Sequence, residues 1–92
     1  MKSLYLMSKK TVTLDDNARV TLNYCLVEEQ EYRNKPLYGI KLIQENTLQQ
    51  ATSEYTEPLS YSKSYVMNIL NQLINHDILP SNLNEVVDDL VS

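Results

Sequence analysis

The chain has 92 residues, enough for one domain and too few for two. Its hydrophobic fraction of 42% and charged fraction of 22% are those of an ordinary folded protein. Residues 1–46 contain seven Lys or Arg against six acidic residues, whereas residues 47–92 contain one Lys against six, for a total of −4. An acidic second half repels phosphate, which argues against nucleic acid as a primary partner.

The single cysteine, Cys25, rules out an internal disulfide. The sequence has no signal peptide and no run of about 18 apolar residues that could span a membrane. We therefore expect a cytoplasmic protein without a membrane segment.

The first part of the chain predicts a β-hairpin. Leu4 to Met7 and the β-favouring residues 11–13 indicate one long strand, or two short ones with a bend near residues 8–10. Asp15-Asp16-Asn17 is a turn signal, because short Asx side chains bond their own backbone and tolerate left-handed conformations. The next strand alternates clearly, with one apolar face: Ala18, Val20, Leu22, Tyr24 and Leu26. Cys25 falls on the less apolar face, where Val27 suggests partial cover.

A third strand follows the charged loop of residues 28–36, and a fourth is weaker. The third contains Gly39, the only glycine, and a glycine inside a strand indicates a bulge, a bend or a close backbone approach. We interpret Gly39 as a close packing contact with a helix. The segment from Leu48 to Thr56 predicts a weak edge strand, which Pro58 ends.

The last third predicts two helices, at about residues 62–76 and 80–91. Val66, Ile69, Leu70, Leu73 and Ile74 form one helical stripe, and Ser62 is the expected N-cap. Pro80 suits the first turn of the second helix, whose apolar stripe lies opposite Asp88 and Asp89.

Strands followed by helices predict an α+β fold. We expect one domain over residues 1–92, with an antiparallel sheet of three to four strands within residues 2–56. The two C-terminal helices should pack on one face of this sheet, because so few strands cannot bury a face alone.

Two short motifs resemble a known family. One is Tyr38-Gly39-Ile40 ahead of a weak strand and an amphipathic helix; the other is the tail with Pro80, Leu83, Val86, Val87, Asp89 and Leu90. Over about residues 18–92 the chain resembles a family of short uncharacterised bacterial proteins, mostly from Gram-positive anaerobes, catalogued as a domain of unknown function. The resemblance implies a cytoplasmic bacterial protein of α+β fold and no assigned activity.

Residues for catalysis or metal binding are scarce. A nucleophile needs a nearby base, yet the only histidine is His76 at a helix end and the only cysteine is Cys25 in mid-strand. One His and one Cys cannot form a structural zinc site, and one glycine cannot form a phosphate-binding loop. We therefore predict no enzyme activity, no cofactor and no metal.

The aromatic residues point to surfaces instead. All seven are tyrosines, a residue that suits half-exposed interface positions. Packing least explains Tyr32 and Tyr65, and the acidic end of the second helix, with Asp88 and Asp89, is another possible partner surface.

Two functions remain open on this basis. The first is a non-enzymatic interaction or regulatory module that binds a protein partner or itself, through these residues or through the edge strand at 48–56. The second is a small-ligand-binding domain with a pocket between sheet and helices, lined by Tyr24 and Tyr38.

Overall fold

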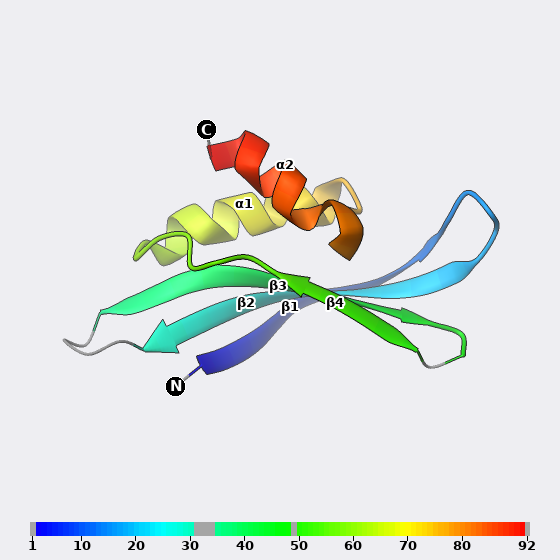
Figure 1. Cartoon of the computed structure of the whole chain (residues 1–92), viewed down its shortest axis with the longest axis horizontal. Coiled ribbons are helices and arrows are strands. Elements are labelled where there is room, and N and C mark those ends of the chain that lie inside the picture. The colour runs from blue at the N-terminus through cyan, green and yellow to red at the C-terminus, as the bar shows by residue number, and fades with distance from the viewer. Residues whose placement is uncertain (1, 31–34, 49, 92) are drawn as a thin grey trace.

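The structure, a computed structural model, describes residues 2–30, 35–48 and 50–91, and all statements below concern these residues. Four antiparallel strands form one sheet in chain order, and two α-helices lie together on one of its faces (Figure 1). This is the predicted α+β fold. The elements are β1 (Lys2–Thr13), β2 (Arg19–Gln30), β3 (Pro36–Asn46), β4 (Ala51–Tyr55), α1 (Lys63–Asn75), the 3₁₀ segment η1 (Pro80–Asn82) and α2 (Leu83–Val91).

The predicted hairpin at Asp15-Asp16-Asn17 is confirmed. The amide of Ala18 donates to Asp16 Oδ1 at 3.0 Å, and Asn17 has the left-handed φ of 66°. Ala18 itself precedes β2 and is exposed, so it does not belong to the buried face on which the sequence placed it.

Strand β1 is one long strand with an irregularity rather than two strands. Its pairing with β2 shifts between Leu6, opposite Cys25, and Ser8, opposite Tyr24, which leaves Met7 as an extra residue. Such a bulge bends a strand and increases its twist. The expected bend therefore occurs at Met7, slightly before the predicted residues 8–10.

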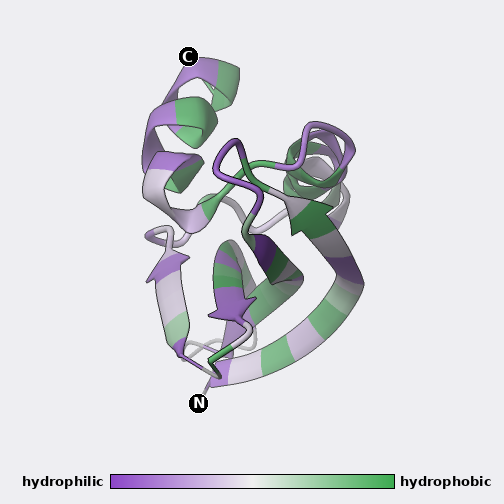
Figure 2. Ribbon diagram, turned by 90° about the vertical axis from the view of Figure 1, so that its right-hand side faces the viewer, coloured by the Kyte–Doolittle hydropathy of each residue, from purple (hydrophilic) through white to green (hydrophobic). Residues whose placement is uncertain are grey.

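Alternate residues of the strands face the helices and form the core, and the alternation is visible as bands of hydropathy along the strands in Figure 2. We call this side of the sheet the covered face. Its buried side chains meet those of α1 and α2 in one cluster: Val20, Leu22, Tyr24, Leu26, Ile40, Leu42, Val66, Ile69, Leu70, Leu73, Leu83 and Val87.

Helix α1 begins where the sequence predicts. Ser62 is the N-cap, and its Oγ accepts a hydrogen bond from the amide of Tyr65 at 3.2 Å. The predicted limits of 62–76 differ by one residue at each end. The second predicted helix, 80–91, is divided: Pro80 opens η1, and the α-helix proper begins at Leu83.

Strand β1 stabilises the C-terminus of α1. The amides of Asp77 and Ile78 bond back to the carbonyls of Ile74 and Leu73, and Asp77 has a φ of 52°. Lys10 Nζ donates to the Ile74 carbonyl at 2.9 Å and forms an ion pair with Asp77. A cation on the sheet thus neutralises the negative end of this helix.

Candidate functional site

The candidate site is the face of the sheet opposite the helices, which we call the open face. Directly paired residues of antiparallel strands point to the same side. Leu4, Val27 and Gly39 therefore form one row of this face, and the next row contains Leu6, Cys25, Lys41 and Tyr55. Both rows lie opposite the core side chains of the same strands.

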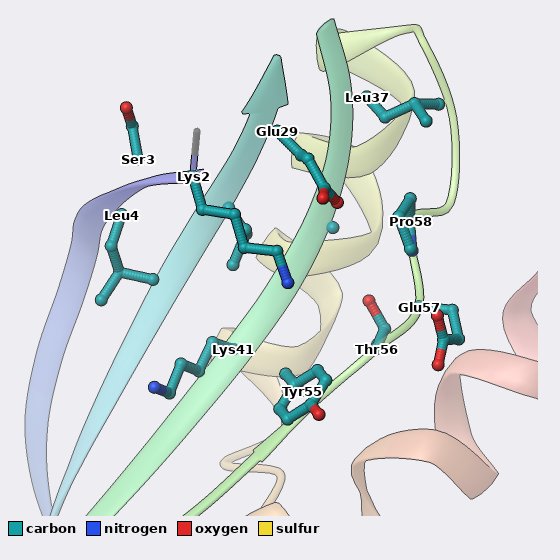
Figure 3. Close-up of a pocket in the computed structure, with 12 residues that line it drawn as sticks. Lys2, Ser3, Leu4, Glu29, Leu37, Lys41, Tyr55, Thr56, Glu57 and Pro58 are labelled. Carbon is teal, nitrogen blue, oxygen red and sulfur yellow. The ribbon is translucent and has the colours of Figure 1, made fainter. Parts of the chain in front are cut away.

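A groove of about 610 Å³ runs across this face. In Figure 3 its side chains stand in front of the strands, with α1 behind them. Both edge strands contribute, and so does the segment that leaves β4. The lining residues are Lys2, Ser3, Leu4, Val27, Glu29, Leu37, Gly39, Lys41, Tyr55, Thr56, Glu57 and Pro58.

Gly39 forms part of the floor of this groove, because the chain after β4 passes close to it. The amide of Thr56 bonds the Ile40 carbonyl at 2.9 Å and that of Tyr38 bonds the Ser60 carbonyl at 2.8 Å, so residues 57–59 lie opposite Gly39. A Cβ on Gly39 would be 3.2 Å from Thr56 Oγ1 and 3.5 Å from the Glu57 carbonyl oxygen.

The sequence therefore indicated the close approach at Gly39 correctly but assigned it to the wrong partner. The atoms near Gly39 belong to the exit segment of β4 and not to a helix. Thr56 Oγ1 also accepts a hydrogen bond from the Ile40 amide at 3.0 Å, which holds the segment in place. A Cβ at this position would be in tighter than ordinary contact with Thr56 Oγ1, so a larger residue would require the exit segment to shift slightly.

Charged side chains lie at both ends of the groove. The Lys2 ammonium, from one edge strand, lies 5.9 Å from the centre of the Tyr55 ring on the other edge strand. This distance is at the limit of a cation–π contact. Figure 3 shows Lys2 and Glu29 extending over the middle of the strands and Lys41 on the lower part of the face. The groove thus offers cations and carboxylates around an apolar floor.

The apolar residues beside the groove are unusually exposed for a strand. Leu4 is 51% exposed, Leu6 57% and Tyr55 60%. Met7, at the bulge, is also exposed, and so is Tyr5, which pairs with Leu26 and therefore points to the covered side of the sheet. Exposed apolar side chains gathered on one surface mark a place where another molecule binds.

Cys25 belongs to the open face but is only 2% exposed, which is more cover than the sequence suggested. Burial raises the pKa of its thiol, and nearby Lys41 only partly offsets this effect. The thiol therefore stays protonated and weakly reactive at neutral pH. His76 caps the end of α1 on the other side of the sheet, so the two cannot act as a nucleophile–base pair.

The pocket predicted between sheet and helices does not form at Tyr24. This side chain is completely buried in the core, and its hydroxyl donates to the Ile78 carbonyl at 3.1 Å. Burial, with a smaller effect of Asp77, raises the pKa of Tyr24 to about 12. Tyr38 is partly buried against the same cluster. The groove is on the opposite face, and its tyrosine is Tyr55.

The residues proposed from the sequence as a partner surface lie away from the groove. Tyr65 is 43% exposed in the first turn of α1, and Asp88 and Asp89 are exposed on α2, where both take part in interactions. All three belong to the helical layer. Tyr32 lies outside the described residues.

Sequence reasoning missed the groove because its residues come from four separate segments. One signal was present: Leu4-Tyr5-Leu6-Met7 is apolar at four consecutive positions, and a strand with one buried face needs only alternate ones. Such a run indicates apolar side chains on both sides of a strand. The order of the strands in the sheet then determines whether another segment of the chain covers the apolar side chains on the second side.

The described residues contain neither a metal-binding cluster nor a membrane-spanning helix. Among the described residues, no three His, Cys, Asp or Glu side chains lie close enough together to hold a metal ion. None of the helices in this part of the chain is long and apolar enough to cross a bilayer.

Comparison with known proteins identifies a family but no function. The model of a family of unknown function, DUF6514, matches residues 3–92. The match includes Leu4–Met7 and so extends beyond the residues 18–92 on which the resemblance was based. No curated protein and no solved structure shows significant similarity to the chain.

Proposed function

Because this chain belongs to DUF6514, a family of unknown function, we propose its role from its own surface: it is a non-enzymatic protein-interaction module. Its partner binds to the open face of the sheet, over the groove and the apolar residues beside it. The bacterial origin and cytoplasmic location implied by the resemblance stay predictions, with which the free thiol of Cys25 agrees.

One observation supports this proposal above the others. On the open face, Leu4, Leu6 and Tyr55 of the two edge strands are each more than half exposed, whereas the residues that β2 and β3 direct to the covered face, such as Leu22, Ile40 and Leu42, are completely buried. Burying apolar area contributes about 25 cal/mol per Å², so these side chains would stabilise a complex. Tyr55, on the β4 edge of this surface, is of a residue type that is enriched in binding hot spots.

The absence of enzyme activity is part of the same proposal. It is supported by the protonated, buried Cys25 and by the position of His76 on the other side of the sheet. A groove whose lysines and glutamates surround apolar side chains is better suited to recognition than to acid–base chemistry.

Affinity capture with matched variants tests the proposal. The tagged protein is compared with Leu6→Ser, Tyr55→Ser on the open face, and with Leu48→Ser as a control. Leu48 is 76% exposed in the β3–β4 turn and lies outside the groove. Leu48→Ser therefore makes the same kind of change, from an exposed apolar residue to serine, away from the proposed binding surface. We expect a stoichiometric partner that the open-face variant loses and the control retains.

A third variant, Tyr65→Ala with Asp88→Asn and Asp89→Asn, tests the helical surface that the sequence favoured. Loss of the partner in this variant alone would move the binding site to the helices. Hydrogen exchange of the purified complex, with protection expected in β1, β3 and β4, provides the direct assignment. A complex that protects only α1 and α2 would overturn the proposal.

A small ligand is the second candidate function, favoured by the size of the groove. Its volume of about 610 Å³ falls within the roughly 300–1,000 Å³ of typical ligand pockets. A thermal-shift screen of metabolites against the wild type and Tyr55→Ser distinguishes the two. A compound that raises the melting temperature of the wild type only would support this second function.

Nucleic acid is not expected as a partner. The helical layer is acidic, and the groove pairs two lysines with two glutamates, so neither surface offers the basic stripe that binds phosphates. A titration against single- and double-stranded DNA and RNA at low salt should be flat.

A further inference from the structure

The outer edge of β1 has unpaired backbone groups over the apolar half of the strand. The sheet order is β1-β2-β3-β4, so β1 and β4 are its two edges. The amide of Asn46 donates to the Gln50 carbonyl, and the amide of Thr56 donates to the Ile40 carbonyl. The backbone N–H and C=O groups of even-numbered β3 residues therefore point towards β4. In an antiparallel ladder, the backbone groups of successive residues point alternately to the two neighbouring strands. The odd-numbered residues of β3 therefore bond β2, and the even-numbered residues of β2 bond β1.

This alternation determines the outward groups of β1. Ser3 and Tyr5, opposite Glu28 and Leu26, bond β2, so the N–H and C=O groups of Lys2, Leu4 and Leu6 point away from the sheet. Their side chains belong to the open face. An added strand would therefore place its own open-face side chains directly opposite these three residues.

The other edge is less available. Strand β4 has five residues against twelve in β1, and Asn84 from α2 donates to the outward carbonyl of Tyr55 at 3.4 Å. A short edge that a helix partly covers is a common protection against pairing. The sequence had favoured this edge for partner binding, and the structure directs attention to β1 instead.

The charge of β1 indicates which kind of segment would pair with its outer edge. Its sequence contains three lysines and no acidic residue, in a chain of net charge −4. Lys10 is engaged by Asp77 and the Ile74 carbonyl. Lys2, which lies opposite Glu29 and 5.9 Å from the centre of the Tyr55 ring, and Lys9 lie on the open face at either end of the apolar stretch. A second copy pairing through β1 would bring two such strands of like charge together, whereas an acidic segment would be attracted.

From these observations we propose that β1 binds an extended, acidic segment of a protein partner as a fifth strand of the sheet. The segment has apolar side chains at two alternate positions, opposite Leu4 and Leu6, and carboxylates at the alternate positions on either side, near Lys2 and Lys9. This inference rests on the proposed function and specifies its binding mode. Backbone hydrogen bonds provide affinity, and the alternate side chains provide specificity.

Edge lysines also protect strands from unwanted pairing. In β1, however, they flank the apolar stretch and do not interrupt it, and the bulge at Met7 lies between Leu6 and Lys9. The arrangement therefore repels copies of the same strand while leaving Lys2 to Leu6 open to a strand of opposite charge.

Two blocked peptides test the proposal against the full-length protein, ETVTVTE and KTVTVTK. They share the same apolar positions and differ only in charge. In a titration followed by NMR of the ¹⁵N-labelled protein, we expect ETVTVTE to bind about tenfold more tightly, with the difference reduced in 1 M salt. The amides of Leu4 and Leu6 should exchange more slowly in the complex, because they become donors to the added strand.

Two variants sharpen the test. Lys2→Glu with Lys9→Glu reverses the charge at exposed positions and should reverse the preference between the peptides. Leu4→Pro removes an outward amide without removing a bond to β2, so it should abolish binding of ETVTVTE while the protein keeps its fold. Circular dichroism and melting of both variants establish that they are folded; for a Leu4→Pro protein that is not, Leu4→Lys serves in its place.

Three results would overturn the proposal: equal binding of the two peptides, no protection of the Leu4 and Leu6 amides, or self-association of the wild type through β1 in sedimentation. Failure here is distinguishable from failure of the proposed function. A natural partner lost in Leu6→Ser, Tyr55→Ser but retained in the Lys2, Lys9 and Leu4→Pro variants binds the open face without adding a strand. A partner retained in all of them contradicts both.

Discussion

The two faces of the sheet are formed by the same strands but differ in how far their apolar side chains are covered. On the covered face, Leu22 and Leu42 have no exposed surface, whereas Leu6 and Tyr55 on the open face are more than half exposed. The alternation of side chains assigns residues to a face, but only a second layer of structure buries them. Apolar residues on the covered face are explained by folding, whereas Leu6 and Tyr55 on the open face gain no such burial, and we propose that a partner covers them.

The largest expected difference between the faces comes from adding a charge. Leu70→Asp introduces a carboxylate into the core, where Leu70 is completely buried, and should abolish the cooperative unfolding transition. Leu6→Asp, at 57% exposure on the open face, should change the free energy of unfolding by less than about 1 kcal/mol. Thermal melts of both proteins measure the contrast. Equal destabilisation by the two changes would mean that the open face is also part of the folding core.

The next effect concerns the covered face at high pH. Burial raises the pKa of Tyr24 to about 12, whereas the unfolded chain titrates near the ordinary value of 10.0. Between these values the unfolded state releases the proton first, so stability falls as pH rises, by up to about 1.4 kcal/mol per pH unit. Below pH 10 this penalty is absent.

Denaturant unfolding of the wild type and Tyr24→Phe between pH 8 and pH 12 isolates this contribution. Tyr24→Phe should be less stable at pH 8, by about 1 kcal/mol, because the Ile78 carbonyl loses its donor. The difference should shrink or reverse towards pH 12. Parallel curves for the two proteins would show that the Tyr24 hydroxyl is not desolvated.

A smaller effect is expected at the floor of the groove. Gly39→Ala places a Cβ 3.2 Å from Thr56 Oγ1, an atom that is held by the Ile40 amide. We expect a loss of about 1–2 kcal/mol, as for moderate overpacking. A double-mutant cycle with Thr56→Ala should show coupling between the sites, because the atom that clashes is then absent. Strictly additive changes would mean that the β4 exit segment moves freely.

The smallest expected effect concerns the chemical reactivity of the Cys25 thiol and not the stability of the fold. The Cys25 thiol lies on the open face beneath its neighbours, and burial raises its pKa. Reaction with a thiol reagent at neutral pH should be about tenfold slower or more in the native protein than in the unfolded one. Leu6→Ala, which removes a neighbour in the same row, should accelerate it. Equal reaction rates in the native and the unfolded protein would show that the neighbouring side chains of the open face do not shield the Cys25 thiol.

Much of the fold could be predicted from local patterns. The Asx turn, the alternation of β2, the stripe of α1 and the Ser62 cap each depend on residues within a few positions of one another, and the structure confirms them. The candidate site could not be predicted in the same way. Tyr65 and the aspartates were chosen as isolated residues, and none of them lines the groove.

Composition and periodicity by themselves determined the α+β class, the hairpin, the limits of the first helix to within one residue, and a close backbone approach at Gly39. Only the tertiary structure decided what approaches Gly39, which edge of the sheet is left open and where the apolar run Leu4–Met7 lies. The reason is that propensity and alternation act between near neighbours in the sequence. The groove, in contrast, depends on the order and curvature of strands whose residues, such as Lys2 and Tyr55, are far apart in the sequence, and local sequence does not encode this arrangement.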